Sequence, residues 1–334
     1  MKKLFLTTLL FCCALQPVHG DGASHPQKVV IQFAPQAEQG KGIAAPALPG
    51  KQKDEAQYTL KSEVKLVNVF VTVTTSRGEP AENLKKEDFE LLEDGAAQTI
   101  AVFGRESQLA LSIVLAIDAS LSTRKDIKLE AASAQRFAHS ILRAGDALSL
   151  YQFTENVTEL LPLTSDLNRI DRAIGRMRIG AATALYDAIY LASQRLVDRK
   201  GRKVLVLITD GGDTASKTNY SEAVRAAQEA EAIVYSIIDV PIAADAGRNT
   251  GGEHALIQLS TDTGGKHFYA ESPGELNKAF RQISDELRTQ YLLAYYPSKR
   301  LSDSEFRSIR VKVSQDRGPL RVAHRSGYYT SRAR

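Results

Sequence analysis

Cysteine is almost absent from this chain of 334 residues, and both cysteines, Cys12 and Cys13, lie within the first twenty. The rest of the chain therefore has no cysteine with which to form a disulfide, and it must be held together by its apolar core, as a domain of this size can be. Long apolar runs are also missing after residue 20, so no later segment is predicted to cross a membrane as a helix.

A strong excess of one charge is missing as well. Once Lys2 and Lys3 are set aside, 41 Lys and Arg residues face 39 Asp and Glu residues. This balance gives no reason to expect binding to nucleic acid or to an anionic membrane. The overall content of 43% hydrophobic and 25% charged residues is typical of a soluble globular protein.

Residues 1–20 have the pattern of a secretory signal peptide. A positive start precedes an apolar stretch at 4–15, and Pro17-Val18-His19-Gly20 ends the segment. We expect cleavage near Gly20 and an extracytoplasmic product, periplasmic or secreted. The alternatives are an uncleaved anchor, for which the apolar stretch is short, and a lipoprotein, for which Phe11 stands where a small residue is needed. Residues 21–56 are rich in Ala, Gly, Pro, Gln and Lys and are predicted to form a flexible linker.

Short strands are predicted on both flanks of the chain. Residues 57–106 contain alternating apolar runs separated by turns with Gly, which is typical of an antiparallel β-sandwich. These residues supply too few strands for an independent sandwich. Residues 288–334 return to the same pattern, and we expect them to complete the sandwich around an inserted domain. A separate C-terminal hairpin is the alternative.

The segment 109–287 alternates apolar strands with amphipathic helices. Such alternation predicts an α/β fold with a mostly parallel, doubly wound sheet that helices cover on both faces. The expected strands are 113–117, 146–153, 157–163, 204–208, 233–238 and 264–269, and the expected helices are 127–142, 167–177, 185–198, 220–232, 254–261 and 273–287, with a polar loop at 239–252.

Oxygen-bearing side chains follow the two most apolar strands. Asp118, Ser120 and Ser122 come after 113–117, and Asp210 comes after 204–208. Thr183 lies in a loop of Gly and Ala that leaves room for a bound ion. Ligands bind beyond the carboxyl ends of strands in open α/β sheets, and hard oxygen donors suit Mg²⁺ or Mn²⁺. Each residue alone is explained equally well by a turn or a helix cap, but their combination predicts a metal site.

The set Asp118-x-Ser120-x-Ser122, Thr183 and Asp210 resembles the metal-ion-dependent adhesion site of the von Willebrand factor type A (VWFA) domain. The resemblance covers 109–287 and includes Thr183-Ala-Leu-Tyr-Asp-Ala-Ile and Ile208-Thr-Asp-Gly. The flanking stretches Leu84-Lys-Lys-Glu-Asp-Phe-Glu-Leu-Leu-Glu-Asp-Gly and Tyr291-Leu-Leu-Ala-Tyr-Tyr-Pro are similar to bacterial "VWFA-related domain" proteins. Leu121 and Thr123 depart from the Gly and Met of many relatives. The resemblance implies a von Willebrand factor A fold and a Thr183 that shifts between open and closed forms.

The expected function is that of a non-enzymatic adhesion module. Its Mg²⁺, or Mn²⁺ or Ca²⁺ in the same place, would bind an Asp or Glu of a partner protein. A metal-dependent hydrolase is the weaker alternative, because the chain has no Gly-x-Ser-x-Gly, no His-Glu-x-x-His and no phosphate-binding loop. A structural envelope module with a purely stabilising ion is the third. Asp187 is interpreted as a charge at the start of a helix or a contact to the nearby loop. Asp213 is interpreted as a turn residue.

Overall fold

The structure is a computed structural model that describes residues 66–105, 109–120, 127–239, 250–298, 305–314 and 319–330. The chain divides into the units Met1–Leu60 and Lys61–Arg334, and every described residue belongs to the second. The predicted signal peptide and linker lie outside the described residues. Among the described residues, no helix combines the length and the apolar character needed to cross a bilayer.

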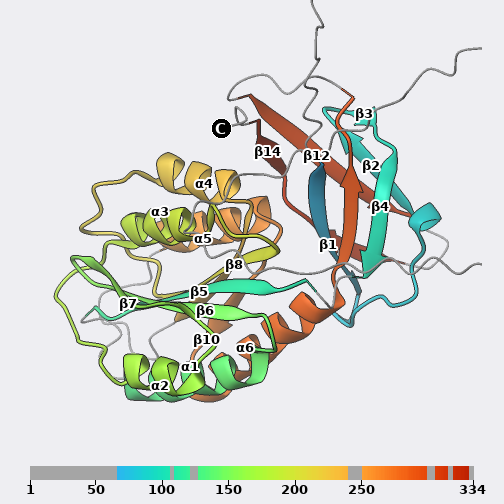
Figure 1. Ribbon diagram of the computed structural model, residues 1–334. Coiled ribbons are helices and arrows are strands. Elements are labelled where there is room, and N and C mark those ends of the chain that lie inside the picture. The colour runs from blue at the N-terminus through green and yellow to red at the C-terminus, as the bar shows by residue number, and fades with distance from the viewer. Residues whose placement is uncertain are drawn as a thin grey trace, which may run out of the picture. The chain divides into compact units, whose positions relative to one another are not determined.

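A six-stranded sheet forms the centre of the α/β domain (Figure 1). Its central strand is β5 (Leu111–Asp118), in which every residue is buried. On either side, β6 (Ala147–Phe153) and β8 (Arg202–Thr209) run parallel to β5. The order across the sheet is β10 (His267–Ala270), β9 (Ala232–Asp239), β8, β5, β6 and β7 (Val157–Thr164), with β7 antiparallel to β6.

Helices cover both faces of this sheet (Figure 1). One face packs on α1 (Ile127–Ile141), α2 (Leu167–Ile174) and α6 (Pro273–Thr289), and the other on α3 (Leu185–Leu196), α4 (Tyr220–Glu229) and α5 (Thr250–Asp262). Successive residues of β5 alternate between the two cores: Ile113 and Leu115 belong to the first, whereas Val114 and Ala116 belong to the second. The predicted doubly wound α/β fold is confirmed.

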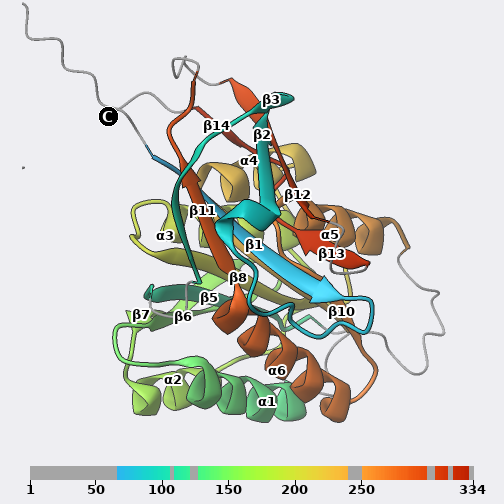
Figure 2. The ribbon, with the colours of Figure 1, turned by 90° about the vertical axis from the view of Figure 1, so that its right-hand side faces the viewer.

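The flanking strands form two four-stranded antiparallel sheets (Figure 2). Strand β1 pairs with β11 and β13, and β2 pairs with β12, so strands from both ends of the sequence share each sheet. The prediction that the C-terminal strands complete the sandwich is confirmed. The sheets are β13-β1-β11-β4 and β14-β12-β2-β3, with β1 Val67–Thr75, β2 Phe89–Glu93, β3 Ala96–Ala97, β4 Ile100–Arg105, β11 Tyr291–Tyr295, β12 Phe306–Val313, β13 Leu320–Ala323 and β14 Gly327–Tyr329.

The core of the sandwich contains a buried polar network. The Glu93 carboxylate accepts hydrogen bonds from the hydroxyls of Tyr295 and Tyr328, at 2.5 and 2.9 Å, and forms an ion pair with Arg307 at 3.0 Å. Tyr295 and Tyr328 belong to the same apolar core as Val69 and Leu293. Among the tyrosines of the C-terminal flank, Tyr291, Tyr295 and Tyr328 are buried, whereas Tyr296 is 54% exposed.

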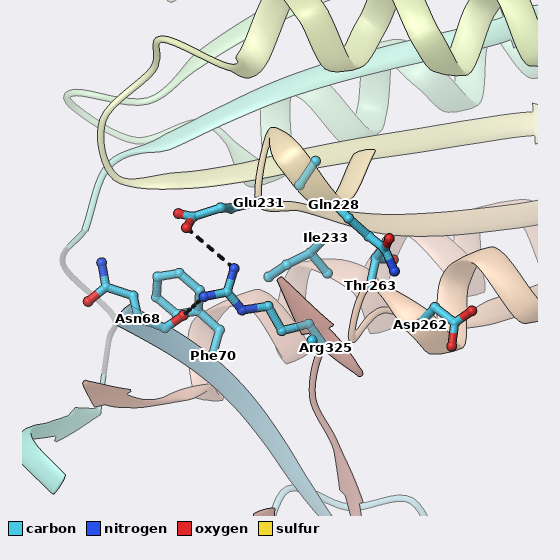
Figure 3. Close-up of a pocket in the computed structure, with 10 residues that line it drawn as sticks. Asn68, Phe70, Gln228, Glu231, Ile233, Asp262, Thr263 and Arg325 are labelled. Carbon is cyan, nitrogen blue, oxygen red and sulfur yellow. Dashed lines mark hydrogen bonds and ion pairs between the residues drawn. The ribbon is translucent and has the colours of Figure 1, made fainter. Parts of the chain in front are cut away.

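A small cavity lies between β1 and the turn that joins α4 to β9 (Figure 3). Arg325 reaches across it, donating to the carbonyl oxygen of Asn68 at 2.6 Å and lying 3.4 Å from a carboxylate oxygen of Glu231. Nearby, the backbone N–H of Ser326 donates to the carbonyl oxygen of Asp262. These contacts join the sandwich to the α/β domain.

Several element boundaries differ from the prediction, among them the end of α4 and the start of β10, and those of α2 and α5 have a local cause. Helix α2 ends at Ile174 rather than 177, because the chain turns at Gly175, whose N–H bonds back to the helix. Helix α5 begins at Thr250, inside the expected polar loop. Helix-breaking Gly251 and Gly252 hid this first turn from sequence reasoning.

Candidate metal centre

Asp118 ends the central strand and is fully buried. One carboxylate oxygen accepts from the backbone N–H of Ser120 at 2.9 Å, and the other accepts from the hydroxyl of Thr209 at 2.8 Å. Burial raises the pKa of Asp118 to about 6, partly opposed by these hydrogen bonds and assisted by the charge of Asp210. A cation placed beside Asp118 would favour its charged form.

The second acidic residue, Asp210, follows the neighbouring strand β8. Strands β5 and β8 run in register, with Ile117 opposite Ile208, so the residues after them emerge on the same edge of the sheet. One carboxylate oxygen of Asp210 accepts from the N–H of Gly212 at 3.0 Å. Gly211 has φ +85°, and a Cβ there would lie 3.1 Å from the backbone of Gly252. Glycine is therefore required for the loop to turn at this point.

The loop before α3 carries Thr183, which is 5% exposed. Its N–H donates to the Thr214 hydroxyl at 3.0 Å, and its carbonyl oxygen accepts from the N–H of Thr214 at 2.8 Å. At the other end of this loop, the N–H of Gly180 donates to the carbonyl oxygen of Ala119 at 2.9 Å. The Thr183 loop is therefore hydrogen-bonded both to the segment after β5 and to the loop after β8.

The structure places four of the five predicted ligands in these three connected segments. They are Asp118, Ser120, Thr183 and Asp210, while Ser122 lies outside the described residues. Among the described residues, no three His, Cys, Asp or Glu side chains are grouped so as to hold a metal ion. A metal here would therefore depend on hydroxyl oxygens as well as carboxylates. Such a set of hard oxygen donors is chemically suited to Mg²⁺, Mn²⁺ or Ca²⁺.

Two residues shape this rim in ways that the sequence does not predict: Thr209 is not singled out, and Asp213 is expected only as a turn residue. Thr209 donates to Asp118 and also accepts from the N–H of Gly211 at 3.1 Å, so it connects the two acidic segments. Asp213 accepts from the N–H groups of Leu185 and Tyr186, at 2.9 and 3.3 Å, and so caps α3 from another loop. The signal for Asp213 was the absence of a capping side chain at Ala184, the residue before α3.

The sequence predicts a helix-start charge or a loop contact for Asp187. Its carboxylate accepts from the backbone N–H groups of Lys217 and Thr218, at 3.1 and 2.8 Å. These bonds lower the pKa of Asp187 against the opposing effect of burial, which is the largest single influence. Asp187 thus fastens the loop after β8 to α3.

Comparison with known proteins gives one family match. Residues 113–213 match the family model described as the von Willebrand factor type A domain. No curated protein matches the chain.

Several solved structures are similar to this chain at low identity. BatB from Bacteroides thetaiotaomicron is 18% identical, with 54% of this chain and 100% of that chain covered and a TM-score of 0.44. The vWF domain of the type V pili tip protein Mfa5 from Porphyromonas gingivalis is 14% identical, with 54% and 95% covered and a TM-score of 0.45. A von Willebrand factor type A protein from Catenulispora acidiphila is 14% identical, with 74% of each chain covered and a TM-score of 0.47.

Proposed function

We propose that this chain, whose residues 113–213 match the von Willebrand factor type A domain, is an exported, non-enzymatic adhesion module that binds its partner through a divalent cation. Mg²⁺ is the expected ion, with Mn²⁺ or Ca²⁺ as substitutes. The proposed ligands are Asp118, Ser120, Ser122, Thr183 and Asp210. The proposed partner is a protein that offers the carboxylate of an Asp or Glu.

The observation that supports this proposal is the hydrogen bonding between the three segments. Gly180 bonds to Ala119, Thr183 bonds to Thr214, and Thr209 bonds to Asp118. Oxygen donors from distant parts of the sequence are therefore attached to one edge of the sheet. This preorganisation reduces the entropy that would otherwise be lost when a metal gathers them.

The balance of charged and neutral donors supports a role in binding rather than simple stabilisation. The two carboxylates, Asp118 and Asp210, supply negative charge, while the hydroxyls of Ser120, Ser122 and Thr183 supply neutral oxygens. A divalent ion held largely by neutral oxygens keeps positive charge with which to attract an outside carboxylate. The chain's own residues position the ion, and Asp118 is kept in place by Thr209.

The first experiment measures metal binding by calorimetry and by thermal unfolding, with MgCl₂ added after treatment with EDTA. An ion bound to the folded state at about 100 times its dissociation constant should add about 2.7 kcal/mol to the free energy of unfolding. Asp118→Ala should lose both the heat of binding and the added stability. Asp198→Asn, which alters an exposed carboxylate at the end of α3, should retain both.

The second experiment measures association. A fluorescein-labelled peptide with a single Glu, and the same peptide with Gln, are titrated into the protein in MgCl₂ and in EDTA. The proposal requires binding of the Glu peptide alone, in MgCl₂ alone, and its loss in Asp210→Ala. Stabilisation by Mg²⁺ without any such association would instead identify a structural ion and would contradict the proposal.

A further inference from the structure

A second surface, formed by residues that come shortly before Thr183 in the sequence, lies at the edge of the sheet. Strand β7 is the terminal strand of the six-stranded order, and α2 packs beside it (Figure 1). Together they line a groove of about 520 Å³. Its lining residues are Leu160, Leu161, Pro162, Arg169, Arg172 and Arg176, and we call it the arginine groove. A groove of this volume accommodates several side chains of a ligand.

The two sides of α2 have different roles. Ile170, Ala173 and Ile174 are buried in the core, which fixes the helix against the sheet. Arg169 and Arg172 are one turn apart on the exposed side, and Arg176 follows in the turn after the helix. The helix therefore holds Arg169 and Arg172 along one side of the groove, and Arg176 continues this row from the turn.

These arginines have few anionic neighbours. Among the described residues, none of the three forms an ion pair, and Arg176 donates to the carbonyl oxygen of Leu160 at 3.4 Å. The nearby carboxylates are used elsewhere. Asp166 accepts from the backbone N–H of Arg169 at 3.1 Å as the cap of α2, Asp171 pairs with His139 at 3.0 Å, and Glu159 pairs with Arg195 at 3.0 Å. The positive charge of the groove is thus available to a ligand from outside.

We propose that the arginine groove binds an acidic peptide segment of a partner protein, independently of the metal. Guanidinium groups bind carboxylates through two parallel hydrogen bonds, so a row of three selects a segment with several Asp or Glu residues. The half-buried Leu160 and the exposed Pro162 add an apolar contact for a side chain between those carboxylates.

Two features favour a peptide in the groove over other ligands. Pro162 has no N–H to offer at the edge of the sheet, so a partner strand cannot extend the sheet continuously along β7. A polyanion binds tightly only through many ion pairs, and the groove offers three cations. The remaining Lys and Arg residues of the chain are balanced by Asp and Glu, so they supply no further excess of positive charge. A nucleic acid or an acidic polysaccharide is therefore the less suitable ligand.

The test measures the binding of three fluorescein-labelled peptides by fluorescence anisotropy in EDTA, with labelled heparin and single-stranded DNA titrated in the same way. The first is Gly-Glu-Leu-Glu-Glu-Gly, the second has Gln at each Glu position, and the third has Ser in place of Leu. We expect the first to bind most tightly and the Gln peptide not to bind. Replacing Leu by Ser should weaken binding through loss of the apolar contact.

Two matched variants distinguish binding by the groove arginines from nonspecific attraction to positive charge. The triple variant Arg169→Gln, Arg172→Gln, Arg176→Gln should weaken binding about tenfold, as expected for three partly solvated ion pairs. The control Lys278→Gln, Arg281→Gln, Arg321→Gln removes the same charge from exposed positions elsewhere and should leave binding unchanged. Circular dichroism melting checks that both remain folded.

Three outcomes would overturn the proposal. They are failure of the Glu peptide to bind, equal weakening in the two triple variants, or stronger binding of heparin or single-stranded DNA than of the peptide. Asp118→Ala should bind the peptide normally in EDTA. Loss of the metal-dependent function and loss of the groove's function can therefore be told apart.

Discussion

At the scale of single residues, the environment of Asp118 decides the charge of a proposed metal ligand. Its two oxygens accept from Ser120 and Thr209, yet burial still raises its pKa to about 6. Hydrogen bonds thus only partly offset the loss of water around this carboxylate. The side chain is held in place at the cost of stability, which is common where a site serves function rather than folding.

The sequence identified Asp118 and Asp210 because polar residues directly after apolar strands are conspicuous. It did not reveal Thr209, which reads as the last residue of an apolar run. Its hydroxyl can donate to Asp118 because β5 lies beside β8 in the folded sheet, and the order of the strands in the sheet is not written in the sequence. A residue's role in contacts between two loops therefore cannot be predicted from the pattern of apolar and polar residues alone.

His324 has a defined protonation state in the sandwich. Its Nδ1 lies 2.8 Å from the carbonyl oxygen of Arg325, which can only accept, and its Nε2 accepts from the N–H of Val311 at 3.1 Å. The ring is therefore neutral, with the proton on Nδ1. Burial lowers the pKa of His324, and repulsion from Arg310 contributes in the same direction.

We predict that acidification destabilises the sandwich through His324. As pH falls through about 6.5, His324 becomes protonated in the unfolded chain but stays neutral in the folded state. The free energy of unfolding therefore falls with pH until the pH is below the pKa of His324 in the folded state. His324→Gln should lose less stability than the wild type between about pH 7 and pH 5, as measured by urea unfolding. Burial also lowers the pKa of His267, so His267→Gln should remove a separate part of the slope. An unchanged slope in His324→Gln would contradict the prediction.

At the scale of elements, α3 has its cap supplied from a distant loop. Ala184 precedes the helix and offers no side-chain acceptor, and Asp213 takes that role for Leu185 and Tyr186. The Ser216 hydroxyl donates to the same Asp213 oxygen at 2.5 Å. Asp213 thus connects the start of α3 to the loop that carries Asp210.

We predict that Asp213→Ala lowers the free energy of unfolding by about 1 to 2 kcal/mol, the usual cost of a lost helix cap. Asp213→Asn keeps one acceptor oxygen and should lose less. Urea unfolding in EDTA measures the effect without any contribution from metal. Equal stability of Asp213→Ala and the wild type would show that the N–H groups of α3 find other acceptors.

The elements themselves were predicted well wherever apolar periodicity was long. The strand expected at 113–117 became β5, and the helix expected at 273–287 became α6, with ends displaced by about two residues. Prediction was poorer at α5, where paired glycines lie in the first turn. There, packing of the helix start against Gly211 outweighs the low helix propensity of glycine.

At the scale of the whole described unit, the two flanks of the sequence depend on each other. Glu93 comes before the α/β domain, whereas Arg307, Tyr295 and Tyr328 come after it. Burial and the bond to Glu93 raise the pKa of both tyrosines, so their hydroxyls remain donors. A shortage of strands in residues 57–106 was enough to predict this pairing, but the buried ion pair at its centre was not foreseen.

We predict that Glu93→Ala lowers the free energy of unfolding by about 3 to 5 kcal/mol, because it leaves the buried charge of Arg307 without its main partner. Glu90→Ala is a matched control on the same strand, since Glu90 forms an exposed ion pair with Lys312 at 3.1 Å. The control should change stability by less than about 0.5 kcal/mol. Similar losses in the two variants would refute the view that burial sets the cost.

The pairing of β4 with β11 has a consequence for how the protein would respond to pulling. Arg105, the last residue of β4, stands opposite Tyr291, the first residue of β11. Tension applied through the two flanks of the sequence would pass from β1 to its neighbours across backbone hydrogen bonds, and would bypass the inserted domain. The force would therefore reach the candidate metal centre only after the strands of the sandwich had separated.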